Sequence, residues 1–153
     1  MNYFTDEKVI NGTANRDYLK HSEQIWSKLL QGLKDIQYIS LPQQLVQKSN
    51  NTVYIHDARI QAYEFSEGQQ NLTLIVRSDN DGELRVSSFQ YIGIVKTSPL
   101  PYQLIGTNSS ECDILNQEID MNDAGNYIHR LYFATNIEFE IIFQDFVLKT
   151  LSG

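Results

Sequence analysis

The chain has 153 residues, 41% of them hydrophobic and 11% aromatic, and its 19 acidic and 12 basic side chains give a net charge of −7. This is the size of one ordinary domain, and no apolar run approaches the roughly 20 residues that a membrane-spanning helix needs. The aromatic content excludes a disordered chain, so we expect one folded, non-membrane domain over residues 1–153.

The first predicted element is an amphipathic helix over about residues 15–33. Asn15 is a suitable N-cap, and Asp17 adds negative charge near the positive end of the helix dipole. Apolar residues recur at helical spacing, and Trp26 lies in the middle of their stripe, where a core position is expected. Pro42 prevents a helix from continuing through a polar loop that runs to about residue 52.

After residue 52 the hydrophobic period changes from that of a helix to that of a strand. Ser66-Glu67-Gly68 and Asp79-Asn80-Asp81-Gly82 are short and polar and contain Gly, so each predicts a hairpin turn. The residues between these turns and after them are rich in β-branched and aromatic side chains. The predicted strand segments are residues 53–65, 71–77, 83–96 and 127–143.

This order predicts an α+β domain with an N-terminal helix and a strand region over about residues 52–150. We expect the helix to pack on a strongly bent, mostly antiparallel sheet or open barrel of six to seven strands. The sequence contains no glycine-rich phosphate-binding motif and no crossover helices between the strands, so we expect no nucleotide cofactor.

The number of cysteines and the N-terminal residues indicate the cellular compartment of the protein. Cys112 is the single cysteine, and residues 1–10 lack the basic and apolar regions of a secretory signal. We therefore expect a cytoplasmic protein. Glu111 and Asp113 flank Cys112 and oppose thiolate formation, so the cysteine is expected to be unreactive.

The negative charge is concentrated in residues 111–145, which contain eight acidic residues and one basic residue, Arg130. Such a segment repels phosphate backbones, so direct nucleic-acid binding is not expected, whereas a basic protein partner is attracted. The alternative is that these acids only solvate the surface of a small domain and keep it soluble.

A search for catalytic residues yields only histidine candidates. His56 and Asp57 are neighbours in a predicted strand and should point to opposite faces. If the two Tyr-Ile-His segments lay side by side, His56 and His129 could ligate a metal together with Glu118. Without a third fixed ligand or a nucleophile motif, we expect a non-enzymatic protein with no metal site, and we keep the metal-dependent enzyme as an alternative.

Several segments resemble small bacterial cytoplasmic proteins, some of which are encoded beside polymorphic or contact-dependent toxins. The resemblance rests on residues 1–5 and on the runs Ile55–Ile60, Asn71–Leu74 and Ile137–Phe146. The last of these runs is similar to the final strand of several immunity proteins. The resemblance implies an immunity protein that binds a cognate toxin domain, for example a nuclease, and blocks its active site or its access to substrate.

An acidic inhibitor suits this role, because a nuclease needs a basic surface for its substrate. A second interpretation is a barrel whose aromatic lining holds a small apolar ligand. The predicted partner-binding residues are Glu111, Asp113, Glu118, Asp120, Asp123 and Tyr127.

Overall fold

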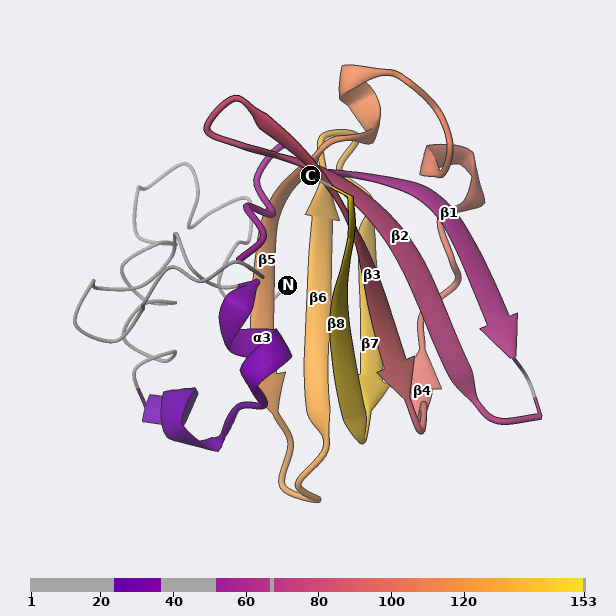
Figure 1. The fold of residues 1–153 in the computed structure, drawn as a ribbon. Helices are drawn as coiled ribbons and strands as arrows, with labels where there is room; N and C mark the ends of the chain where they lie inside the picture. Colours follow the sequence, from indigo (N-terminus) through magenta and orange to yellow (C-terminus); the bar gives the residue numbers. More distant parts are fainter. Residues whose placement is uncertain (1–23, 37–51, 67, 153) are drawn as a thin grey trace, which may run out of the picture.

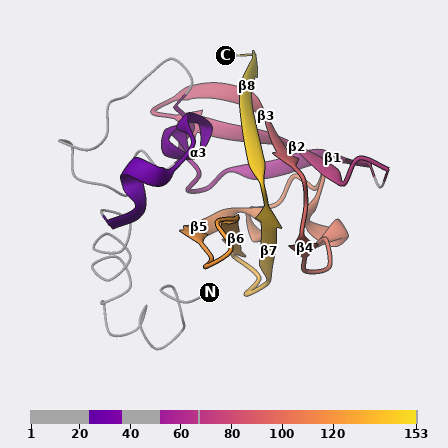
Figure 2. The same ribbon diagram turned by 90° about the horizontal axis from the view of Figure 1, so that it is seen from below.

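The structure is a computed structural model that describes residues 24–36, 52–66 and 68–152. Within these residues, eight strands form two four-stranded antiparallel sheets that face each other as two layers (Figures 1 and 2). Strands account for 52% of the described residues, so this part of the chain is mostly β. The predicted antiparallel arrangement is confirmed, whereas the helices in the described residues are shorter than expected.

The first sheet has the strand order β1-β2-β3-β8. Its first three strands form a meander, in which each strand pairs with the next along the chain, as the two predicted hairpin turns imply. The bounds are β1 Arg59–Ser66, β2 Asn71–Asn80, β3 Glu83–Ile92 and β8 Asp145–Ser152.

The second sheet has the order β4-β7-β6-β5 and contains a strand that the sequence did not predict. This strand is β5, whose Asn-Gln-Glu segment lacks the β-branched and aromatic residues typical of strands. The bounds are β4 Lys96–Thr97, β5 Ile114–Met121, β6 Tyr127–Phe133 and β7 Glu138–Phe143.

The two sheets are joined at a sharp corner where β7 runs into β8 (Figure 2). Only Gln144 separates the two strands, and its N–H donates to the carbonyl of Ile92 at 3.0 Å. Gly93 lies against this corner with φ +68°, and a Cβ there would lie 2.5 Å from Gln144 Oε1. The corner divides the strands into two layers, which replace the predicted single bent sheet or open barrel.

The β2–β3 hairpin confirms its predicted turn. Asp81 and Gly82 both have positive φ, as a tight two-residue hairpin requires. Gly82 N–H also donates to Oδ1 of Asp79, a residue of β2, at 2.6 Å, and this hydrogen bond stabilises the turn.

The core lies between the sheets and is rich in aromatic rings. Tyr91 of β3 packs edge-on against Phe143 of β7 at 5.0 Å between ring centroids and contacts Phe146 of β8 at 5.1 Å. Because these rings come from both layers and from both sides of the corner, they bind the two sheets together. Other fully buried large side chains are Phe89, Phe133, Phe139, Ile60, Leu72, Leu74 and Ile114.

The predicted continuous helix over residues 15–33 is wrong in its described part. A 3-10 turn, η1 (Trp26–Lys28), is followed by extended backbone at Leu29 and Leu30 and then by α3 (Gln31–Asp35). Residues 15–23 lie outside the described residues. The helix α3 packs against β8, as a Cβ at Gly32 would lie 2.9 Å from the Phe146 ring.

Trp26 is only half-buried at the edge of the core, with Lys34 Nζ 5.5 Å from its ring centroid. No helix in the described residues is long and apolar enough to cross a membrane.

The predicted strand over residues 53–65 begins later than expected. Residues 53–58 form extended backbone and a turn, in which Asp57 has φ +65°, and β1 starts only at Arg59. Two further 3-10 turns, η3 (Tyr102–Leu104) and η4 (Ser110–Cys112), lie in the connection between β4 and β5.

Candidate functional site

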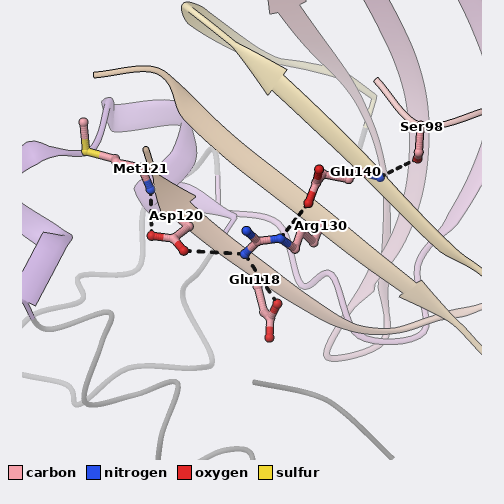
Figure 3. A network of polar contacts seen from close by, with 6 residues as sticks. All are labelled: Ser98, Glu118, Asp120, Met121, Arg130 and Glu140. Atoms are coloured by element: carbon pink, nitrogen blue, oxygen red, sulfur yellow. Dashed lines mark hydrogen bonds and ion pairs between the residues drawn. The ribbon is translucent and has the colours of Figure 1, made fainter. Parts of the chain in front are cut away.

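The centre of the acidic segment forms an ion-pair network around Arg130 on the outer face of the second sheet (Figure 3). Cross-strand register places Glu118 of β5 and Glu140 of β7 directly opposite Arg130 of β6. Arg130 Nε donates to Glu140 Oε2 at 2.8 Å, and its Nη1 lies 3.5 Å from Asp120 Oδ2 and 3.7 Å from Glu118 Oε2.

Most of this network is buried, so its charges are poorly screened by water. The side chain of Glu118 is 0% exposed, that of Arg130 10% and that of Asp120 15%, whereas that of Glu140 is 39% exposed. Burial by itself disfavours the guanidinium charge, but the Glu140 hydrogen bond and the charges of Glu118, Glu140 and Asp120 outweigh it. The pKa of Arg130 is raised as a result, so the group stays charged.

The carboxylates of Glu118, Asp120 and Glu140 all lie within ion-pair distance of this guanidinium. The outermost member of the network also touches a neighbouring loop, because Glu140 N–H donates to Ser98 Oγ at 2.9 Å. Two predicted partner-binding residues, Glu118 and Asp120, therefore lie together in a structural network. Glu118 offers no accessible surface for direct contact.

The other predicted partner-binding residues lie apart from this network. Glu111 belongs to η4 before β5, and Asp123 lies in the turn after β5; both are exposed. Eight strand residues separate these two positions, which is about 26 Å at the usual rise of a strand. Asp113 is 15% exposed and accepts a 2.5 Å contact from Arg59 Nε. The acids thus form no single continuous patch.

Tyr127 was predicted to be a partner-binding residue, and its ring is partly buried. It stacks on Phe143 with 5.9 Å between ring centroids, and its hydroxyl donates to the carbonyl of Lys28 at 3.3 Å. The residue therefore connects β6 to the helical segment at the edge of the core.

A second polar network lies inside the sandwich, around His129. The Tyr91 hydroxyl lies 2.8 Å from His129 Nδ1, and His129 Nε2 lies 2.8 Å from Gln117 Oε1. Gln117 Nε2 donates in turn to the carbonyl of Ile36 at 2.5 Å. Because that carbonyl only accepts, the Gln117 oxygen must face His129, and His129 carries its proton on Nε2 and accepts from Tyr91.

This network is neutral. Burial lowers the pKa of His129 from 6.5 to about 3 and raises the pKa of the Tyr91 hydroxyl well above its usual value. Both groups are held in their uncharged forms, and both nitrogens of His129 have hydrogen-bond partners. The network joins the two sheets to the end of α3 and leaves His129 no lone pair for a metal.

His56 occupies a different place from His129. Its side chain is 56% exposed; Nδ1 lies 2.7 Å from the carbonyl of Leu115, and Nε2 lies 3.5 Å from Asp57 Oδ1. The expectation that His56 and Asp57 point apart is wrong, because they lie in a turn and not in a strand. Glu118 faces away from His129, and the described residues contain no cluster of three or more potential metal ligands.

The feature that sequence reasoning missed is an apolar groove of about 320 Å³ at the open edge between the sheets. Its walls come from the free edge strands β1 and β4 and from the loop that follows β4 (Figure 1). The lining residues are Phe65, Leu72, Thr97, Ser98, Pro99, Leu100, Tyr102 and Phe139.

Aromatic rings at the mouth of this groove are exposed to solvent. Tyr63 is 42% exposed, Phe65 43% and Tyr102 62%, and the rings of Tyr63 and Tyr102 lie 5.3 Å apart. Alternation along β1 places Tyr63 and Phe65 on one face, but only the loop after β4 turns that face into a groove. We refer to these three residues as the aromatic rim.

Comparisons with protein-family models, curated proteins and solved structures found no match. The functional assignment therefore rests on the geometry of this chain.

Proposed function

We propose that this protein is an immunity protein, a non-catalytic inhibitor that binds a cognate bacterial toxin domain and blocks its active site or its access to substrate. The observation that carries the proposal is the aromatic rim around an apolar groove. Gln117, His129 and Arg130 are buried and belong to structural networks, whereas these aromatic side chains lie where a partner can reach them.

The composition of the rim suits a protein partner. Tyrosine is enriched among the residues that dominate binding energy in protein interfaces, because its ring offers a large rigid surface and its hydroxyl a hydrogen bond. Clustered exposed apolar groups on a folded domain commonly mark an interaction site. Within the described residues β1 is also an edge strand of its sheet, and its residues 61–65 are all exposed.

Charge next to the groove supports a basic partner. Phe139 lines the groove between Glu138 and Glu140 in sequence, and Ser98 joins the groove to the Arg130 network. The side chain of Glu140 in that network is 39% exposed, and Glu138 is exposed as well, so negative charge lies beside the groove. A basic toxin surface, as a nuclease needs for its substrate, is attracted by such a field.

The groove also favours a second function, the binding of a small apolar ligand. Its volume of about 320 Å³ lies at the lower end of the range of about 300–1,000 Å³ that is usual for ligand pockets. In that case the rim would close over a buried ligand instead of contacting a protein.

The decisive experiment measures binding to the toxin domain encoded beside the gene. We expect a saturable complex and protection of cells that express the toxin. Tyr63→Ala and Tyr102→Ala should each weaken binding by about 30-fold, the effect of a 2 kcal/mol hot spot. Leu84→Ala is the matched control, since Leu84 is 53% exposed at the distant β2–β3 hairpin.

Equal binding by the tyrosine variants and the control would contradict the assignment of the rim. Binding of a small apolar dye that both tyrosine changes abolish, without any affinity for the toxin, would favour the ligand-binding function instead.

The contribution of charge is tested with exposed acids only, because changing Glu118 or Asp120 would disturb Arg130. The double variant Glu111→Gln/Asp123→Asn should slow association at low salt and lose much of the effect at 0.15 M, where the screening length is about 8 Å. Asp79→Asn/Glu83→Gln is the control, with the same charge change at another exposed site. Identical association rates for both pairs would make the acidic segment a solvated surface.

A further inference from the structure

A second concave site lies at the other end of β1 from the groove, where β1 and β2 meet the connection between η3 and η4. It is a pocket of about 290 Å³. In contrast to the groove, most of its lining residues are polar, and two of them are arginines, in a chain whose net charge is −7. The lining residues are Arg59, Ile60, Gln61, Arg77, Gly106, Thr107 and Asn108.

Arg59 is held in a fixed orientation at this pocket. Its Nε donates to Asp113 Oδ1 at 2.5 Å, and its Nη1 donates to Asn108 Oδ1 at 2.6 Å. Because the oxygen of the Asn108 amide accepts from Arg59, its NH2 group keeps both donors. Arg59 has further N–H groups beyond the two that these contacts use.

Arg77 lies directly opposite Arg59 in the β1–β2 register, so the two side chains share one face of the sheet. Like charges directly opposite each other destabilise a sheet. Asp113 balances the charge of Arg59, whereas the side chain of Arg77 makes no hydrogen bond or ion pair within the described residues. The pocket therefore keeps a surplus charge of +1 on a half-buried guanidinium.

We propose that this pocket binds a small oxyanion, with the chemistry of a phosphate group. Arg77 is free to make a two-pronged contact with two oxygens, and Arg59 and the Asn108 amide offer donors from the other side. A water molecule occupies about 30 Å³ in the liquid, so 290 Å³ has room for a phosphate and an attached organic group. The expected ligand is a small phosphate monoester.

This proposal is independent of the immunity function. The groove begins at Phe65 near the end of β1, and the anion pocket begins at Arg59 at its first residue. The overall negative charge selects against long polyanions, whereas a small anion needs only the local positive charge.

The test is an NMR titration of the full chain with inorganic phosphate and with glycerol 1-phosphate, in chloride at constant ionic strength. We expect saturable shifts of the backbone amides of residues 106–108. Arg77→Gln should weaken binding at least about tenfold, and Arg77→Lys should give an intermediate affinity because it keeps the charge and loses the planar fork.

Lys149→Gln is the matched control, because it removes one positive charge at an exposed site on β8, and it should bind like the wild type. The proposal is overturned if phosphate causes no saturable shift, if chloride alone reproduces the shifts, or if Arg77→Gln binds as tightly as Lys149→Gln. Equal affinity for acetate would overturn the assignment to phosphate chemistry.

Discussion

His129 and Arg130 are neighbours on β6, yet they solve the problem of a buried polar side chain in opposite ways. His129 points between the sheets, where it is neutral and joins Tyr91 to Gln117. Arg130 points to the other face, where it is charged and faces three carboxylates. The inner network has no net charge to desolvate, and the outer one depends on opposite charges that must all be present.

This difference predicts which substitutions lower the stability of the protein most. A missing partner in the inner network leaves a buried dipole without a hydrogen bond, whereas a missing partner in the outer network leaves a buried charge. We therefore expect a substitution at the buried centre of the Arg130 network to lower stability more than a substitution in the His129 network. A substitution at the exposed edge of the Arg130 network should lower stability less.

The largest effect is expected for Arg130→Met. This change removes the guanidinium that lies 3.7 Å from the carboxylate of Glu118, which is 0% exposed, and should cost about 3–5 kcal/mol of the free energy of unfolding. Urea denaturation measures it. Adding Glu118→Gln to the same chain should restore part of the loss, and an unchanged midpoint for Arg130→Met would contradict the comparison.

A somewhat smaller loss is expected for His129→Leu. It removes the partner of both the Tyr91 hydroxyl and the Gln117 oxygen, at about 1–3 kcal/mol for each buried group, so we expect about 2–4 kcal/mol in all. Tyr91→Phe leaves only one nitrogen unpaired and should cost less. If Tyr91→Phe cost more than His129→Leu in denaturant unfolding, the described hydrogen-bond chain would be wrong.

The inner network also predicts a dependence on pH. The folded pKa of His129, about 3, lies below its usual value of 6.5, so between these values only the unfolded chain takes up the proton. Stability is complete above pH 6.5 and falls with decreasing pH, by roughly 1 kcal/mol per unit. Unfolding measured between pH 7 and 5 should reveal this slope.

His129→Leu should reduce that slope, and His56→Asn, which changes an exposed histidine, should keep it. A slope of the same size in both variants would assign the pH dependence to other groups.

The smallest loss of stability is expected at the exposed edge of the Arg130 network. Glu140→Gln keeps an oxygen acceptor for Arg130, and the 39% exposed side chain is screened by water, so the loss should stay below about 1 kcal/mol. Differential scanning calorimetry at two salt concentrations measures it. A loss as large as that of Arg130→Met would contradict the expectation that exposed members of the network contribute less to stability than buried ones.

The elements predicted best are those whose information is local. The β2–β3 hairpin follows from Asp81 and Gly82, which tolerate positive φ, and the strands beside it follow from their alternation. The strand β5 was missed because polar residues replace the usual strand formers there. Its polar side chains make sense only beside Tyr91, His129 and Arg130, which are distant in the sequence.

The candidate sites were predicted less well, for the same reason. The excess of acids in residues 111–145 is visible in the sequence, but their separation into the buried Glu118, the half-buried Asp120 and the exposed Asp123 is not. The pairing of Arg59 with Arg77 depends on strand register. The groove depends on the path of the loop after β4.

The amino-acid sequence is enough to predict the mostly antiparallel architecture, the hairpins that link the first three strands and the concentration of negative charge. Each of these rests on periodicity, turn residues or composition, which act over a few neighbouring positions. Tertiary contacts are needed to explain why β7 turns into β8 to make two layers, why His129 is neutral and Arg130 charged, and why aromatic rings surround a groove. These features depend on contacts between side chains that are distant in the sequence. Burial and hydrogen-bond or ion partners determine the free energy of each buried polar group, and packing determines which apolar side chains stay exposed.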